Sequence, residues 1–211
     1  MRKKTASQTR REREKVEKRD RILNAAHAII LKEGFAALTM RHLASAIEYS
    51  AASLYLHFKD RRAIARELSQ RGYAALLSAL QSSMKPGSAE ASLRSFAQAY
   101  TRFGMEQPET YRLILMEAPE YIATVFDGKQ PYDPEDPATQ SFALLLDIVE
   151  RLRRAARSRI PAQELAESIW CGLHGIVSLK LTCGTAPAAT AERLTELHVR
   201  SVLASLQPRD P

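Results

Sequence analysis

Cysteine and long apolar runs are scarce in this 211-residue chain. The separation of its two cysteines, Cys171 and Cys183, matches neither a disulfide framework nor a Cys-x-x-Cys redox motif. No apolar run approaches the roughly 18 residues of a membrane-spanning helix. The basic N-terminus lacks the uninterrupted apolar segment of a secretory signal. We therefore expect a soluble protein of the reducing cytoplasm with no membrane partner.

Motifs typical of enzymes are missing as well. The chain has no phosphate-binding loop, no Gly-x-Gly-x-x-Gly run and no Ser-His-Asp motif. Its five histidines show no metal-ligand spacing with either cysteine. The acids of the Pro-broken loop 127–137 lack the regular spacing of a calcium loop. We expect a protein that is not an enzyme and has no metal or cofactor, and a helical enzyme is a distant alternative.

Alternating strand patterns with turn residues are also absent, and nearly every segment has helical periodicity. We expect helices at about 20–33, 40–47, 51–58, 61–84, 89–105, 108–117, 119–126, 138–158, 162–182 and 188–206. The predicted fold class is all-α, with an N-terminal three-helix domain followed by a larger helical bundle, about nine helices in total.

Positive charge is concentrated at the N-terminus. Residues 1–21 hold ten Lys and Arg and four acids, so this segment alone has a net charge of +6, out of +7 for the whole chain. Such an excess favours an anionic partner, either nucleic acid or an anionic membrane surface. A solvated, disordered tail is the alternative for its first ten residues.

The stretch 50–60, SAASLYLHFKD, begins with unusually small side chains. Thr39 and Ser50 each stand at the cap of a short helix, and two short helices joined by a tight turn form a helix-turn-helix. The second helix of this motif can enter the DNA major groove. Leu54 and Phe58 are four residues apart and face the core, so the small residues of the other faces let the backbone approach base edges.

Polar groups near the end of the same helix can reach DNA phosphates. They are the Tyr55 hydroxyl, the His57 ring and Lys59, and the N-termini of this helix and the next offer free N–H groups as well. A three-helix unit that only packs and binds nothing is the structural alternative.

Residues 20–68 resemble the DNA-binding domain of TetR-type transcriptional regulators. The run LTMRHLASAIEYSAASLYLHFKDRRAI, residues 38–64, fits the family pattern without gaps. The resemblance implies that Tyr55, His57 and Arg61 contact phosphates. It also implies that the groove is lined by Thr39, Arg41, Tyr49, Ser50, Ala51 and Ala52, and Ser53 and Lys59 complete the expected DNA-binding set. Glu48 departs from the family, which usually has Gly in this turn, and is unfavourable if the position needs a positive φ.

The second half resembles one subgroup of TetR C-terminal domains. The matching runs are YRLIL (111–115) and WCGLHGIVSL (170–179), the latter with a Trp-x-x-x-His-Gly motif. The resemblance implies a dimeric repressor that an unknown small-molecule effector releases from a double-stranded DNA operator. Repressor and activator stay open, as does a ligand-independent architectural DNA-binding protein. We expect a basic arm at 1–19, the DNA-binding domain at 20–84 with its helix-turn-helix at 39–58, and a ligand-sensing and dimerisation domain at 85–211.

Small residues form one stripe of the helix 162–182, and the last helix is apolar on more than one face, which favours a homodimer. The predicted interface comprises Cys171, Gly172, Gly175, Ser178, Thr182, Leu194, Leu197 and Val202. Burial of both helices within a monomer is the alternative.

A small-molecule pocket is expected inside the same bundle. Its candidate residues are Tyr100, Phe103, Tyr111, Met116, Phe142, Trp170 and His174. Aromatic and Met residues of this kind are more often plain core, and His174 is more often a satisfied core histidine than a ligand contact.

Overall fold

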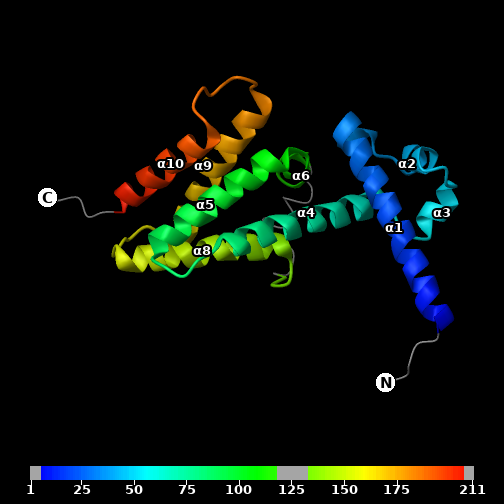
Figure 1. Cartoon of the computed structure of the whole chain (residues 1–211), viewed down its shortest axis with the longest axis horizontal. Coiled ribbons are helices and arrows are strands. Elements are labelled where there is room, and N and C mark those ends of the chain that lie inside the picture. Colours follow the sequence, from blue (N-terminus) through cyan, green and yellow to red (C-terminus); the bar gives the residue numbers. More distant parts are fainter. Residues whose placement is uncertain (1–5, 118–132, 207–211) are drawn as a thin grey trace.

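The computed structural model describes residues 6–117 and 133–206, and all regular secondary structure in this part of the chain is helical (Figure 1). Its α-helices are α1 (Ala6–Glu33), α2 (Met40–Ala46), α3 (Ala51–Tyr55), α4 (Arg61–Ser83), α5 (Ala89–Glu106), α6 (Pro108–Arg112), α8 (Pro137–Ala155), α9 (Ala162–Thr182) and α10 (Ala191–Ser205). A 3₁₀ turn at Phe35–Ala37 follows α1, and a π-helical turn at Leu113–Glu117 follows α6. The all-α prediction, with short N-terminal helices and a larger bundle, is confirmed.

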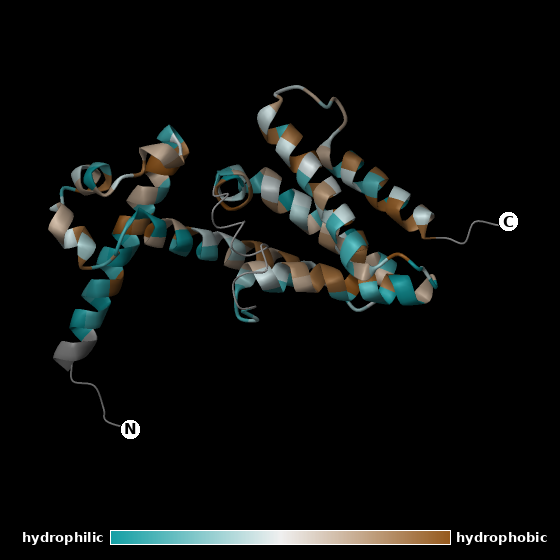
Figure 2. Cartoon of the chain, turned by 180° about the vertical axis from the view of Figure 1, so that it is seen from behind, coloured by the Kyte–Doolittle hydropathy of each residue, from teal (hydrophilic) through white to brown (hydrophobic). Residues whose placement is uncertain are grey.

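Helix α1 is longer than the sequence pattern indicated. It begins at Ala6 instead of near residue 20, so most of the expected basic arm is helical. Arg, Glu and Lys predominate over residues 10–19 and lose little side-chain freedom in a helix. Arg10 and Glu14 also form an i, i+4 ion pair at 3.5 Å. Figure 2 shows this half of α1 mainly in hydrophilic colours, and residues 10–18 are all exposed, so these turns bury no apolar face.

The remaining boundaries lie close to those expected. The helix expected at 108–117 divides into α6 and the π-helical turn. α10 begins at Ala191, three residues later than expected, because the Thr190 side chain caps it by accepting a hydrogen bond from the Arg193 N–H at 3.2 Å. The helix expected at 119–126 lies outside the described residues.

Helix α4 joins the two parts of the molecule (Figure 1). Its first turns pack with α1, and its later turns pack with α5 and α8. α9 and α10 complete the bundle against α5. Among the described helices, none is both long enough and apolar enough to cross a lipid bilayer.

The bundle is tightly packed where α5 meets α9. A Cβ atom at Gly104 of α5 would overlap the Val177 side chain of α9 and would lie 3.0 Å from Tyr111 Cδ2. Glycine at this position therefore allows the two helices to approach closely. Phe103, beside it, is buried in the core.

Candidate nucleic-acid interface and ligand cavity

Three side chains cap the helices of the N-terminal domain and fix its geometry. Thr39 Oγ1 accepts from the His42 N–H at 3.1 Å at the start of α2. Ser50 Oγ accepts from the Ser53 N–H at 3.1 Å at the start of α3. Asp60 Oδ1 accepts from the Ala63 N–H at 2.8 Å at the start of α4. Each cap satisfies a backbone donor that a helix leaves unpaired and so fixes where the helix begins.

Helix α3 has one buried face and one bare face. Leu54 and Phe58 are 0% and 2% exposed and hold α3 and the turn after it against the core of the domain. The expected DNA-binding set also includes residues at the starts of α2 and α4. Its exposed members are Thr39, Arg41, Ser50, Ala51, Ala52, Tyr55, Lys59 and Arg61, and its half-buried members are Tyr49, Ser53 and His57. The structure therefore brings the predicted set together on one end of the molecule (Figure 1).

The turn between α2 and α3 places Glu48 at a positive φ of 57°. The Tyr49 N–H donates to the Ala44 carbonyl at 2.9 Å, and the Glu48 N–H donates to the Ser45 carbonyl at 3.3 Å. This pair of bonds is the Schellman motif, whose left-handed residue is usually glycine. Glu48 thus occupies the strained position that the sequence analysis identified.

Arg19 has a structural role that its place in the basic run concealed. Its guanidinium forms a bidentate pair with the Glu67 carboxylate, with Nε 2.9 Å from Oε2. It also donates from Nη1 to the His57 carbonyl at 2.7 Å and lies 4.0 Å above the Phe58 ring. Arg19 therefore ties α1 to α4 and to the end of α3, and it is not one of the freely exposed basic groups of α1.

The basic half of α1 lies close to the end of α3. Burial lowers the pKa of the His57 imidazole, and the positive charges of Lys18, Lys15 and Arg19 lower it further. His57 Nδ1 is buried without a hydrogen-bond partner among the described residues. The Arg21 guanidinium lies 5.4 Å from the centre of the Tyr49 ring, which gives α1 a contact with the turn before α3. Positive charge on α1 therefore lies close to the exposed side of α3.

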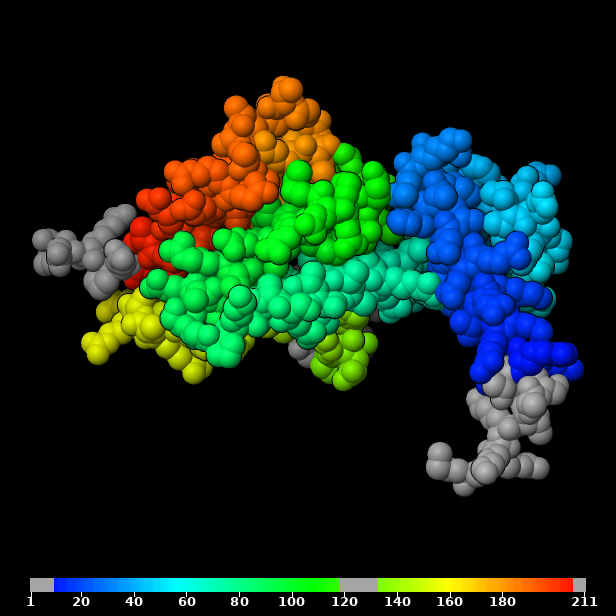
Figure 3. Space-filling view, in the orientation of Figure 1, coloured from blue at the N-terminus to red at the C-terminus, as the bar shows by residue number. Residues whose placement is uncertain are grey.

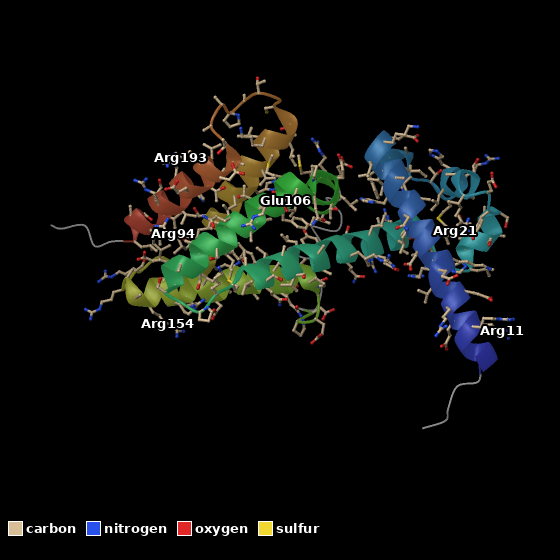
Figure 4. All side chains as sticks on the ribbon, in the orientation of Figure 1. Arg11, Arg21, Arg94, Glu106, Arg154 and Arg193 are labelled. Atoms are coloured by element: carbon tan, nitrogen blue, oxygen red, sulfur yellow. The ribbon has the colours of Figure 1, made fainter. Side chains whose placement is uncertain are left out.

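Other arginines lie far from this end. Figure 4 shows Arg11 and Arg21 on α1, whereas Arg94, Arg154 and Arg193 lie at the opposite end of the bundle. Arg154 and Arg193 form helical ion pairs with Glu150 and Glu196 at 3.6 and 2.9 Å.

Helix α1 also approaches the bundle. His27 of α1 is close enough to Glu109 of α6 for the carboxylate to oppose the effect of burial, which lowers the histidine pKa. Figure 3 shows the surface of α6 reaching that of α1 above α4. The two parts therefore lie close to each other at α1 and α6, in addition to sharing α4.

A small cavity lies inside the bundle, between α4, α5, α8 and α9. Its volume is about 30 Å³, enough for a few water molecules at most. Three of the predicted ligand residues line it, namely Tyr100, Phe142 and Trp170. Tyr73 of α4 and Ser141 of α8 also line it and were not singled out by the sequence analysis, because polar residues in apolar helical patterns resemble ordinary core.

The other predicted ligand residues stand apart from the cavity. Tyr111 and His174 lie behind its wall in a chain of hydrogen bonds. Trp170 Nε1 donates to Tyr100 Oη at 3.2 Å, Tyr100 Oη is 3.0 Å from Tyr111 Oη, and Tyr111 Oη is 2.7 Å from His174 Nδ1. Burial raises the pKa of both tyrosines and lowers that of His174, so it favours the neutral form of all three rings. Phe103 and Met116 pack in or against the core.

The predicted dimer residues divide between the surface and the interior. Cys171, Thr182 and Leu197 are exposed, and Ser178, Leu194 and Gly175 are half-buried. A Cβ atom at Gly175 would have no neighbour within 4 Å. Gly172 instead makes room for the His198 ring of α10, and Val202 is only 9% exposed, so both serve the packing of α9 on α10 within the chain.

Comparisons with known proteins match both parts of the chain. Residues 22–68 match the family described as bacterial regulatory proteins, tetR family, and residues 93–202 match the tetracyclin repressor-like C-terminal domain. The second match alone covers more than half of the chain. The chain therefore belongs to the TetR family of DNA-binding transcriptional regulators. The TetR resemblance and the prediction that the chain is not an enzyme are confirmed, and the Trp-x-x-x-His-Gly subgroup stays a prediction.

Individual relatives are more distant. The uncharacterized HTH-type transcriptional regulator YobS of Bacillus subtilis (strain 168) is 29% identical over 96 residues, which are 46% of this chain and 50% of YobS. The chain thus spans about half the length of that curated relative.

Two solved structures share the fold. The fatty acid degradation regulator FadR from Bacillus halodurans has a TM-score of 0.70 at 14% identity, covering 96% of this chain and 97% of FadR. The TetR family transcriptional regulator PfmR from Thermus thermophilus has a TM-score of 0.63 at 19% identity, covering 87% of this chain and 97% of PfmR.

Proposed function

We propose that this protein binds a double-stranded DNA operator as a homodimer and represses transcription until a small-molecule effector releases it. One observation carries the DNA-binding part. Helix α3 presents the small, exposed residues Ser50, Ala51 and Ala52 beside the basic half of α1, while Leu54 and Phe58 hold it in place. A bare helix next to positive charge suits close approach to a major groove.

Within this proposal, base reading falls to a few residues around the start of α3. Arg41, Tyr49 and Ser50 supply hydrogen bonds, and Ala51 and Ala52 offer apolar contacts to thymine methyl groups. The phosphate contacts come from Tyr55, His57, Lys59 and Arg61, with Thr39 and Ser53 at the edge of the groove.

Three functional units follow from this assignment. Residues 1–19 supply additional positive charge, residues 20–84 read the operator, and residues 85–211 dimerise and sense the effector. Helix α4 belongs to the second unit by its start and contributes Leu76 and Leu80 to the cavity of the third.

We place the dimer interface on the exposed faces of α9 and α10. Leu179 and Leu197 are 48% and 40% exposed, and a Cβ atom at Gly175 of α9 would meet open space. Gly175→Leu should fill that space, hold two copies apart and weaken DNA binding. Light scattering that finds the unmodified protein monomeric at micromolar concentration would end this assignment.

The effector site is assigned to the cavity beside Trp170. A cavity of roughly 150 Å³ is enough to bind benzene in a protein core, so this one has to enlarge before an organic molecule enters. Because α4 lines the cavity and begins directly after α3, enlargement that displaces α4 changes the position of the reading helix. Such coupling requires the effector to bind the two states with different affinity.

The second candidate is a ligand-independent architectural DNA-binding protein whose bundle only dimerises. The small volume of the cavity favours the architectural protein. The contribution of α4 to the cavity lining favours the effector-responsive repressor. Compounds that release operator from the protein in a screen decide for the sensor. A screen in which ligands bind without any release decides for the architectural protein.

DNA contacts are tested by comparing operator with random-sequence duplexes. Deleting residues 2–15 should lower both affinities by similar factors and flatten their salt dependence, because these groups act by neutralising phosphates. Arg41→Ala should instead reduce the preference for operator, by about 1–3 kcal/mol for a bidentate base contact. A deletion that abolishes the preference and leaves random-sequence binding intact would contradict these roles.

A further inference from the structure

One face of α1 changes from apolar to basic along the helix. Residues spaced by three or four positions share one face of a helix. On one such face, α1 buries Ile22, Ala26 and Ile29 in the N-terminal domain. The same spacing continues toward the N-terminus through three exposed residues, which we call the basic row: Lys18, Lys15 and Arg11. The buried face of α1 therefore continues beyond the domain as a line of positive charge.

Arg19 fixes the direction of the basic row. It follows Lys15 by one helical turn, and its guanidinium bonds to the Glu67 carboxylate and to the His57 carbonyl. Burial lowers the pKa of the His57 imidazole, and the charges of Lys18, Lys15 and Arg19 lower it further. The row is thus directed toward the end of α3, and its charges are felt there.

The other faces of this half of α1 have mixed charge. At 3.6 residues per turn, Glu17 and Asp20 lie on faces other than the basic row. Asp20 pairs with Arg71 of α4 at 2.7 Å. Glu14, at the edge of the row, pairs with Arg10 at 3.5 Å. Each of the three positions of the row, by contrast, carries a positive charge.

The basic row is held on a helix that extends past the N-terminal domain. Figures 1 and 2 show the first half of α1 projecting past α3, on the side away from α9 and α10. From Lys18 to Arg11 the helix rises about 10 Å, at about 1.5 Å per residue. This length corresponds to about three base pairs of duplex at about 3.4 Å each. A preformed helix also loses less conformational freedom on binding than a flexible tail does.

We propose that Arg11, Lys15 and Lys18 bind DNA phosphates just outside each half-site and extend the contact there by about three base pairs. The inference rests on the proposed function, because the row adjoins α3 and points away from the assigned dimer interface. It assigns the phosphate contact of the basic segment to one face of a helix. Arg10 and Arg13, on other faces of the same turns, contribute little.

Two double variants test the role of the face, because they remove the same charge from different sides of α1. The row variant is Lys15→Gln with Lys18→Gln, and the outer variant is Arg10→Gln with Arg13→Gln. Glutamine has nearly the helix propensity of lysine and arginine. The probes are the duplex that the protein enriches from a random pool and a random-sequence duplex of equal length.

The row variant should bind both duplexes about tenfold more weakly, the effect of four exposed ion pairs lost from a dimer. Its salt slope should fall by about one unit for each lysine removed. The outer variant should change both quantities much less. Circular dichroism checks that both variants keep the helical content of the unmodified protein.

An exchange of neighbouring residues separates the position of a charge from the total charge. Glu17→Lys with Lys18→Glu leaves the net charge unchanged but reverses the sign at one position of the row. It should weaken binding to both duplexes, whereas a segment that acted only through its total charge would bind as before.

The length of the duplex tests where the row binds. Removing about three base pairs from each end of the enriched duplex, up to the half-sites, should weaken the unmodified protein and the outer variant. The row variant should be insensitive to the same shortening, because it has already lost the contact with the flanks. Unchanged affinity of the unmodified protein for the shortened duplex would place the row elsewhere and overturn the inference.

The remaining outcomes separate this inference from the proposed function. Equal effects of the row and outer variants, or an exchange without effect, overturn the inference. So does a row variant that binds duplexes normally but no longer binds vesicles containing phosphatidylserine, because the partner is then an anionic membrane. Failure of the proposed function looks different, since no duplex is then enriched while the two variants still differ on the random-sequence duplex.

Discussion

The two ends of α4 adjoin different kinds of region, one exposed and one buried. Near its start, small and polar residues of α3 are exposed at the surface. Buried Leu54 and Phe58 hold this helix in place. Toward its end, Leu76 and Leu80 are buried, and the polar groups nearby bond to one another instead of to solvent. In the first region, the helix caps join residues only three positions apart, as in the Ser50–Ser53 and Asp60–Ala63 bonds. The second depends on residues up to 70 positions apart, as in the Trp170–Tyr100 bond. A short motif can therefore identify the first region, whereas the second requires the folded chain.

Removing Arg19 should have the largest effect on the N-terminal domain. Arg19→Ala leaves the Glu67 carboxylate and the His57 carbonyl without their donor and removes the contact with Phe58. We expect a loss of about 3 kcal/mol in the free energy of unfolding, measured by urea denaturation. Arg10→Ala is the control, because its pair with Glu14 is exposed and should contribute under about 0.5 kcal/mol. Equal losses in the two variants would show that Arg19 is an ordinary surface arginine.

Adding a methyl group where α5 meets α9 should destabilise the helical bundle. Gly104→Ala places a methyl group against Val177 and should lower the free energy of unfolding by about 2 kcal/mol. Gly175→Ala is the matched change on the neighbouring helix, where the single chain has open space. In a monomer it should stabilise by about 1 kcal/mol, because alanine favours helix over glycine. Destabilisation of the dimer by Gly175→Ala would indicate that a second copy packs directly on this glycine.

The strained turn should give a smaller gain. Glu48→Gly removes the penalty of a positive φ and should stabilise the N-terminal domain by about 1 kcal/mol. Arg157→Gly is a control with the same geometry, because Arg157 has a φ of 51° after α8. Both melting temperatures should rise. A lower melting temperature for Glu48→Gly alone would mean that the glutamate side chain has a compensating contact.

Acid should weaken the bundle slightly through His174. Burial lowers its pKa below the ordinary value of 6.5, so the unfolded chain takes up the proton first as pH falls. The free energy of unfolding therefore declines below pH 6.5 and stops declining once the folded histidine is also protonated. His174→Gln should show a smaller decline between about pH 7.5 and about pH 5.5. An identical decline in the variant would assign the effect to His27 and His57, whose pKa values are lowered too.

Much of the fold could be predicted from sequence because capping and apolar periodicity are local. Ser50 and Asp60 mark the starts of α3 and α4, and the expected helix 162–182 coincides with α9. The first half of α1 was missed because a solvated helix has no apolar stripe to detect. Arg19, also in α1, could not be distinguished by sequence from the exposed basic residues, because its partner Glu67 lies 48 residues away.

The candidate sites show the same contrast. Every member of the expected DNA-binding set lies at one end of the molecule, although their contacts with DNA stay predictions. In the bundle, aromatic composition indicated Tyr100, Phe142 and Trp170, but it could not separate them from Phe103, which packs in the core. Composition carries no information on which side of a buried ring the space lies.

The central claim is that the end of the molecule around α3 reads a specific DNA sequence. It is tested most directly by selecting bound duplexes from a random pool with the full-length protein and, in parallel, with Arg41→Ala. We predict that the unmodified protein enriches one sequence with two related half-sites, as a two-fold dimer requires, and that Arg41→Ala loses preference at one position in each half. Enrichment of no sequence by the unmodified protein, with binding that depends only on salt, would contradict the claim.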